Sequence, residues 1–103
     1  MSKISVIAKL TAAEGKEAEL QGAIDALISA ADEEPGLEVY SCHTTSDEPG
    51  AFYFFELYTD TDAARAHGQG DRMKSAMAAV GNLLAERPKI TRMTPIAAKG
   101  LDI

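Results

Sequence analysis

The sequence has few of the residues that build disulfides, metal sites and cofactor sites. Among its 103 residues there is one cysteine, Cys42, and there are two histidines and no tryptophan. A single cysteine excludes a disulfide within the chain and any metal site built from several cysteines. The spaced glycine-rich loop that binds dinucleotides is also missing. We therefore predict neither a bound cofactor nor a metal.

Long apolar runs and basic clusters are scarce as well. No run approaches the roughly 20 apolar residues that a membrane-spanning helix needs. Residues 1–10 lack the apolar core and cleavage site of a signal peptide. The formal net charge is −6, and an acidic surface repels the phosphate backbone of nucleic acids. We therefore predict a cytoplasmic protein that binds neither nucleic acid nor membranes.

The composition that remains is that of one globular domain. Hydrophobic residues make up 46% of the chain and charged residues 25%, which is ordinary for a soluble protein. A chain of this length can build one modest core. We expect residues 1–103 to form a single domain, with a core at about residues 3–96 and a C-terminal tail at 97–103.

Hydrophobic spacing predicts the order strand, helix, strand, strand, helix, strand. The strands are expected at residues 3–10, 37–46, 51–59 and 89–96. The helices are expected at about residues 14–33 and 71–85, with a short helix from the N-cap Asp60 to His67. A turn at residues 47–50 makes the middle strands a hairpin. This order is typical of a ferredoxin-like α+β fold, with a four-stranded antiparallel sheet and both long helices on one face.

The third strand is apolar on both of its faces, which bears on the oligomeric state. Alternation places Phe54 and Tyr58 on one face and Phe55 and Leu57 on the other. Ile7 likewise adds an apolar residue to the second face of the first strand. Two helices cover only one face of a sheet, and soluble monomers rarely expose a large apolar patch. We predict a homodimer in which two sheets pack face to face.

The order of these motifs resembles the antibiotic biosynthesis monooxygenase family over about residues 3–96. The cues are Glu14-Gly15-Lys16, Glu34-Pro35-Gly36, the Asp47–Gly50 turn, and the third-strand acid Glu56 followed by Tyr58, the acidic start at Asp60, alanine and His67. The resemblance implies a dimeric α/β barrel with a ligand pocket between sheet and helices in each subunit. It also implies varied chemistry. Some members oxygenate polyketide-like phenols without a cofactor, others oxidise hydroquinones, degrade haem or isomerise a phosphorylated autoinducer sugar, and many have no known activity.

Two departures from the family pattern narrow this range. The third-strand aromatic is usually tryptophan in the family, but Tyr58 stands here. Haem degraders share an asparagine on the first strand, where this chain has Ala8 or Lys9. Haem degradation is therefore disfavoured. Tyr58 followed by an acidic turn is closer to the autoinducer isomerases and the quinol-oxidising subgroup.

Glu56, Tyr58 and His67 are the candidate catalytic residues. Glu56 and Tyr58 are two positions apart, so they share a strand face. A carboxylate among aromatic side chains loses solvation, which suits it to general acid–base catalysis. The alternative is a structural ion pair between Glu56 and Arg92. His67 ends the short helix, where it either exchanges a proton with substrate or caps helix carbonyls.

The position of His43 depends on the register of the hairpin. If residue 46 pairs with residue 51, His43 lies opposite Phe54 and shares a face with Glu56, whereas a slip of one residue separates them. A cross-strand polar pair without a chemical role is the alternative. Neither histidine belongs to a spaced pair, so we do not expect His43, Glu56 and His67 to bind a metal.

The remaining candidates are side chains that would surround a substrate. The expected substrate-binding residues are His43, Tyr40, Phe54, Met73, Met77 and Arg92. The methionines lie at helical spacing and serve equally well as core residues. The leading functional hypothesis is a cofactor-independent monooxygenase or quinol oxidoreductase that acts with molecular oxygen on a small phenolic, quinol or polyketide-like substrate. The alternatives are an isomerase of a phosphorylated autoinducer-type sugar and a non-catalytic dimer that binds a small molecule.

Overall fold

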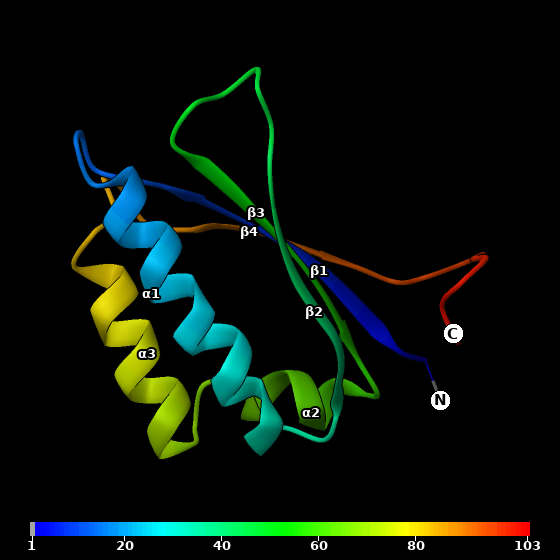
Figure 1. The fold of residues 1–103 in the computed structure, drawn as a ribbon. Helices are drawn as coiled ribbons and strands as arrows, with labels where there is room; N and C mark the ends of the chain where they lie inside the picture. Colours follow the sequence, from blue (N-terminus) through cyan, green and yellow to red (C-terminus); the bar gives the residue numbers. More distant parts are fainter. Residues whose placement is uncertain (1) are drawn as a thin grey trace.

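The computed structural model describes residues 2–103 and has a four-stranded sheet with its helices on one side (Figure 1). The elements are β1 (Ile4–Thr11), α1 (Glu17–Ala30), the 3-10 turn η1 (Ala31–Glu33), β2 (Leu37–Thr44), β3 (Ala51–Tyr58), α2 (Thr61–Ala66), α3 (Asp71–Gly81) and β4 (Lys89–Met93). The strand order is β2-β3-β1-β4, and every neighbouring pair is antiparallel. The predicted ferredoxin-like α+β fold is confirmed. Within residues 2–103 no helix combines the length and the apolar character that crossing a membrane requires.

The long helices are shorter than the hydrophobic spacing predicts. Gly15 has a φ of +79°, a backbone conformation that favours glycine, and the chain turns there before α1 begins at Glu17. Thr11 is the last residue of β1 and lies outside the helix. At the other end, α1 tightens into η1 before Pro35, which cannot continue the helix.

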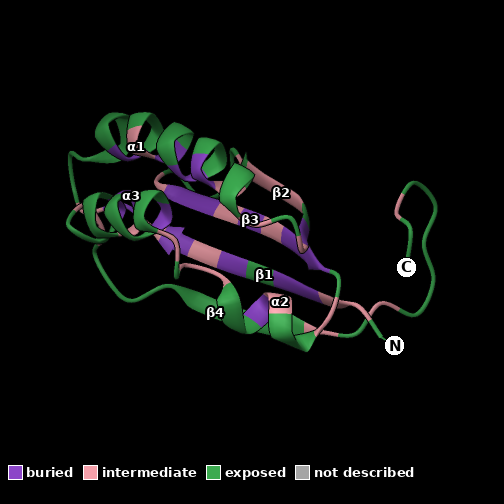
Figure 2. Cartoon of the chain, turned by 90° about the horizontal axis from the view of Figure 1, so that it is seen from below, coloured by how far each residue is buried: buried purple, intermediate pink, exposed green. Residues whose placement is uncertain are grey.

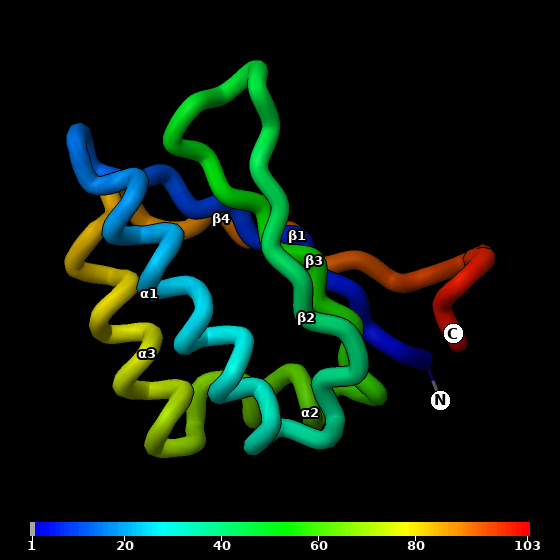
Figure 3. The backbone as a smooth tube through the Cα atoms, viewed as in Figure 1, coloured from blue at the N-terminus to red at the C-terminus, as the bar shows by residue number. Residues whose placement is uncertain are grey.

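The short helix begins where the sequence predicts. The side chain of Asp60 accepts a hydrogen bond from the backbone N–H of Ala63 at 2.8 Å, which is the ordinary N-cap arrangement. The helix ends at Ala66, and His67 is its C-cap residue. The backbone trace shows the chain from α1 into β2 passing close to α2 (Figure 3). His67 is therefore carried to the helix-covered side of the sheet.

The sheet register separates an inner face, covered by the helices, from an outer face. Across β1 and β3, Val6 pairs with Glu56 and Ala8 pairs with Phe54. These four residues are buried, and the burial pattern is strongest where the strands lie under the helices (Figure 2). The inner face packs against the apolar sides of α1 and α3 to form the core. Its buried members include Leu10, Leu20, Leu27, Phe52, Met73 and Val80.

The hairpin register differs by one residue from the predicted pairing. His43 pairs with Tyr53, and Cys42 pairs with Phe54. His43 therefore lies on the outer face, away from Glu56, and its ring nitrogen Nε2 hydrogen-bonds the hydroxyl of Ser41 at 2.8 Å. Of the two registers considered, the slipped one is therefore formed, and it places His43 and Glu56 on opposite faces of the sheet.

The outer face is apolar at its centre and polar at its ends. Ile7, which pairs with Phe55, is 38% exposed. At one end Lys9 forms an ion pair with Glu48 at 2.6 Å, and at the other Lys3 forms one with Glu38 at 2.7 Å. The helices leave this surface uncovered (Figure 1).

Candidate functional site

A cavity of about 560 Å³ lies between the inner face of the sheet and the helices, within the range of about 300–1,000 Å³ found for small-molecule sites. Its lining is mostly apolar, with a few polar and charged side chains. Among the lining residues are Val6, Ala8, Leu10, Tyr40, Phe54, Glu56, Tyr58, Arg65, His67, Met77, Ile90 and Arg92. This composition suits a small aromatic ligand that is fixed in orientation by a few polar contacts.

Glu56 is the buried acid of the cavity wall. Only 6% of the residue is exposed, and the hydroxyl of Tyr58 donates a hydrogen bond to its carboxylate from two positions along the same strand. A charged carboxylate is costly to bury unless donors surround it. The contact that was considered as an alternative, an ion pair between Glu56 and Arg92, is not formed. These residues instead flank Val6 on neighbouring strands.

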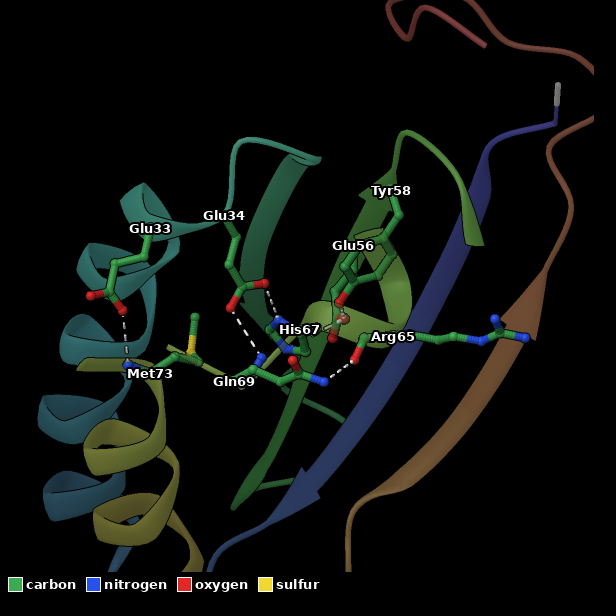
Figure 4. Close-up of polar contacts among 9 residues, drawn as sticks. Glu33, Glu34, Glu56, Tyr58, Arg65, His67, Gln69 and Met73 are labelled. Carbon is green, nitrogen blue, oxygen red and sulfur yellow. Dashed lines mark hydrogen bonds and ion pairs between the residues drawn. The ribbon is translucent and has the colours of Figure 1, made fainter. Parts of the chain in front are cut away.

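His67 lies between two carboxylates (Figure 4). Its Nδ1 is 2.7 Å from Oε1 of Glu34, and its Nε2 is 4.0 Å from Oε1 of Glu56. The ring also meets the rings of Tyr40 and Tyr58 edge-on, with centroids 5.6 Å apart in each case. The imidazole is thus held on three sides, with its Nε2 edge toward the cavity acid.

Two arginines supply positive charge where the cavity opens. Arg65 and Arg92 both line the cavity and are exposed. In Figure 4 the Arg65 side chain extends from α2 away from His67 and toward β4. Glu56 is buried deeper than either arginine. The cavity therefore carries negative charge on its inner wall and positive charge at its rim.

The tyrosines and the cysteine near the site hold their protons firmly. Burial, followed by the hydrogen bond to Glu56, raises the pKa of Tyr58 far above its ordinary value. Burial likewise raises the pKa of Tyr40, with a further contribution from the charge of Glu56. Burial raises the pKa of the Cys42 thiol to about 11. Tyr58 therefore acts as a hydrogen-bond donor at neutral pH, and Cys42 is not a thiolate nucleophile.

The structure brings most of the predicted site residues to one cavity. Glu56, Tyr58 and His67 meet there, together with Tyr40, Phe54, Met77 and Arg92. His43 lies on the outer face, so it belongs to no common site with Glu56 and His67. Met73 is fully buried in the core between α1, α3 and the sheet and does not line the cavity.

Glu34 is the member of the polar network that sequence reasoning missed. In the sequence, Glu34 stands out only as the first residue of the Glu34-Pro35-Gly36 motif. The sequence signal was weak, because an acid before Pro-Gly is equally common at an exposed helix end. In the fold, Glu34 lies next to the end of α2, although it is 33 positions from His67 in the sequence. This proximity allows the two side chains to make contact.

The sequence profile described as Antibiotic biosynthesis monooxygenase matches residues 3–79, about three quarters of the chain. The chain belongs to the antibiotic biosynthesis monooxygenase family. The resemblance drawn from the Glu34-Pro35-Gly36 turn, the third-strand acid and His67 is therefore confirmed at the level of the family. A comparison with curated protein sequences found no match.

Several solved structures are similar to this chain over nearly its whole length. A candidate antibiotic biosynthesis monooxygenase from Caulobacter crescentus is 32% identical, with a TM-score of 0.85, and the match covers 93% of this chain and 92% of that one. Rv0793 from Mycobacterium tuberculosis is 26% identical, with a TM-score of 0.83 and coverage of 94% and 98%. NE2512 from Nitrosomonas europaea, described as a protein of unknown function, is 26% identical, with a TM-score of 0.83 and coverage of 99% and 97%.

Proposed function

We propose that this antibiotic biosynthesis monooxygenase homologue oxidises a small phenolic or quinol-like substrate with molecular oxygen and without a cofactor. The observation that carries the proposal is the pairing of a buried acid and an imidazole, Glu56 and His67, on the wall of an apolar cavity. An apolar cavity wall strengthens electrostatic interactions with a bound substrate, because it lowers the local dielectric constant. Family membership supports the same reaction class.

The chemistry requires a base more than it requires a cofactor. A phenol that has lost its proton is electron-rich and passes one electron to oxygen, and the resulting radical pair combines. One oxygen atom then enters the ring as a carbonyl, and the other leaves as water, so the substrate supplies the electrons. A simple hydroquinone instead gives two electrons and two protons to oxygen, yielding a quinone and hydrogen peroxide.

The residues divide this work by their contacts. His67 presents Nε2 toward Glu56 at 4.0 Å, and either group is in position to take the phenolic proton. Tyr58, the third candidate catalytic residue, donates its hydroxyl hydrogen to Glu56. Its proposed role is therefore to hold that carboxylate. Tyr40 and Phe54, whose ring centroids are 5.0 Å apart, supply an aromatic wall.

The test is oxygen consumption with hydroquinone and anthrone, measured for Glu56→Gln, His67→Ala and His43→Ala. Because removal of a general base typically costs about 10²–10⁴-fold, we expect turnover to fall by that order in the first two variants. His43→Ala removes the chain's other histidine from the outer face and is expected to retain turnover. Full turnover in both Glu56→Gln and His67→Ala would remove the proposal.

The arginines at the cavity rim favour a second candidate, an isomerase acting on a phosphorylated sugar. Arg65 and Arg92 are suited to a phosphate, and proton transfer between neighbouring carbons needs only acid–base groups such as Glu56 and His67. An anaerobic assay separates the candidates, because isomerisation proceeds without oxygen whereas oxygenation stops. Ligand binding without any product by mass spectrometry would support a non-catalytic binding protein.

We also propose that two chains form a homodimer through their outer sheet faces. The apolar centre of that face includes Ile7, and ion pairs of Lys9 and Lys3 border it. An apolar centre with a polar rim is the usual anatomy of a stable interface. The cavity lies on the other side of the sheet, so each subunit would keep its own site.

A further inference from the structure

Glu34 is a partly buried acid whose carboxylate makes two hydrogen bonds. Its side chain is only 9% exposed, and acidic residues are rarely buried without partners. Oε1 lies 2.7 Å from Nδ1 of His67, and Oε2 accepts the backbone N–H of Gly68 at 3.1 Å (Figure 4). Both oxygens of the carboxylate thus bind the segment that carries the imidazole.

These contacts decide which nitrogen of His67 carries the proton. An ionised carboxylate only accepts hydrogen bonds, so Nδ1 must donate to Glu34. In the neutral ring, the lone pair is then on Nε2, the nitrogen 4.0 Å from Glu56 and directed at the cavity wall. A separation of 4.0 Å is too long for a direct hydrogen bond. It leaves Nε2 free to accept a proton from a ligand.

We infer that Glu34 is a positioning residue that fixes the tautomer of His67, so that Nε2 is the proton acceptor on the cavity side. The carboxylate acts through the imidazole and does not line the cavity. The kinetic part of this inference rests on the proposed function, whereas the tautomer itself does not.

The preceding residue, Glu33, provides a matched control. Its Oε1 accepts the backbone N–H of Met73 at 3.4 Å, near the start of α3. Glu33 therefore ties backbone segments together as Glu34 does, but without a histidine as partner. A purely structural role for Glu34 would make Glu33→Gln and Glu34→Gln behave alike.

Glu34→Gln changes the hydrogen-bonding pattern without changing the shape. Glutamine has one acceptor oxygen in place of two, and the Gly68 N–H can only donate. With the oxygen retained by Gly68, the amide NH₂ faces Nδ1 of His67, which must then accept. The proton of the neutral ring is thereby moved to Nε2, where the proposed reaction needs a lone pair. Glu34→Ala removes both acceptors and releases the ring to a mixture of tautomers.

The experiment is a ¹⁵N–¹H NMR correlation spectrum of the histidine side chains, recorded at several pH values so that the neutral rings are observed. We expect His67 to carry its proton on Nδ1 in the wild type and in Glu33→Gln, and on Nε2 in Glu34→Gln. His43 provides an internal reference that none of these variants contacts. Turnover on hydroquinone is expected to fall at least about tenfold in Glu34→Gln, mainly in kcat, since tautomer-fixing carboxylates contribute more than this elsewhere.

The outcomes separate this inference from the proposed function. An Nε2–H tautomer in the wild type, or the wild-type tautomer retained in both Glu34 variants, would overturn the positioning role even if turnover fell. A switched tautomer with unchanged turnover would support the positioning role and remove His67 from the proposed chemistry. If the His67 tautomer also changed in Glu33→Gln, substitution of either acid in this turn would have the same effect. That result would overturn the assignment to Glu34.

Discussion

At the scale of single residues, the site depends on how one buried carboxylate is held. Glu56 is 6% exposed and accepts the hydroxyl hydrogen of Tyr58. Every buried side-chain nitrogen or oxygen in residues 2–103 has a hydrogen-bond partner. Removing one donor therefore leaves a buried acceptor without compensation, which costs about 1–3 kcal/mol.

Tyr58→Phe removes that donor while keeping the ring, and we expect it to lower the free energy of unfolding at pH 7 by about 1–3 kcal/mol. The wild type should also lose stability as pH rises above about 10. Because the pKa of Tyr58 is raised in the folded state, the unfolded chain releases its proton first, and ionisation favours unfolding. In Tyr58→Phe this loss should be shallower. Urea unfolding between pH 7 and pH 11 measures both effects.

Tyr53→Phe is the control, because its hydroxyl bonds Glu48 at the exposed end of the outer face. We expect little change in stability at pH 7, as for other exposed polar contacts. Equal stability of Tyr58→Phe and Tyr53→Phe would contradict the role assigned to the bond between Tyr58 and Glu56.

The sequence allowed some of these residues to be placed and not others. Glu56 and Tyr58 were predictable as neighbours because a strand repeats every two residues. His43 was misplaced because a single-residue slip reverses its face, and the turn residues alone did not decide the register. Glu34 was missed because its partner, His67, is distant in sequence. The spacing within one element is encoded locally, whereas contacts between elements require the fold.

At the scale of elements, the position of α2 decides where His67 lies. The turn between η1 and β2 approaches α2 so closely that a Cβ placed on Gly36 would lie 2.5 Å from Cβ of Ala63. Gly36 also accepts a hydrogen bond from the backbone N–H of Thr59, just before α2, at 2.8 Å. The absence of a side chain at residue 36 therefore allows the helix to dock.

Gly36→Ala and Gly22→Ala are expected to have opposite effects on stability. In Gly36→Ala the new methyl group overlaps Ala63, so we expect a loss of about 1–3 kcal/mol and faster hydrogen exchange in α2. Gly22 lies within α1, and no atom comes within 4 Å of a Cβ built there. Gly22→Ala should gain about 0.5–1 kcal/mol, because alanine favours a helix. Chemical unfolding and hydrogen exchange test the pair, and a stabilised Gly36→Ala would contradict the proposed docking of α2.

The boundaries of the elements were less predictable than their order. Asp60 gave the start of α2 correctly because an N-cap has a local signature. The later start of α1 follows from the turn at Gly15, and the early end of α3 at Gly81 leaves Leu84 beside the cavity. Helical spacing continued past the end of α3, because Leu83 and Leu84 pack against the core without being helical.

At the scale of the whole molecule, one face of the sheet builds the site and the helices leave the other uncovered. The helices bury the inner face, where the core and the cavity lie. On the outer face, the cross-strand pair of Ile7 and Phe55 is apolar and partly exposed. The apolar sheet face was predictable from the alternation of β1 and β3. The proposed dimer follows from the cost of leaving such a patch in water.

Ile7→Lys tests the dimer against a closely matched control, Ile28→Lys. Ile7 is 38% exposed on β1 and Ile28 is 37% exposed on α1, so the two substitutions change the same residue type at nearly equal exposure. In a dimer joined through the sheets, the ammonium groups introduced by Ile7→Lys would be buried in the interface and lose hydration, which disfavours association. We expect the wild type and Ile28→Lys to sediment as dimers at micromolar concentration and Ile7→Lys to sediment as a monomer.

The same measurement distinguishes the interface from the site. The contacts of Glu34 with His67 and Gly68 are made within one chain and not through Ile7, so a folded Ile7→Lys monomer should still show the His67 tautomer of the wild type. A wild-type protein that sediments as a monomer would remove the dimer and leave the acid–base pair untouched. Equal dissociation of Ile7→Lys and Ile28→Lys would instead place the interface on a surface other than the sheet. The apolar residues on the outer face of β3 would then need an explanation other than burial by a second copy of the chain.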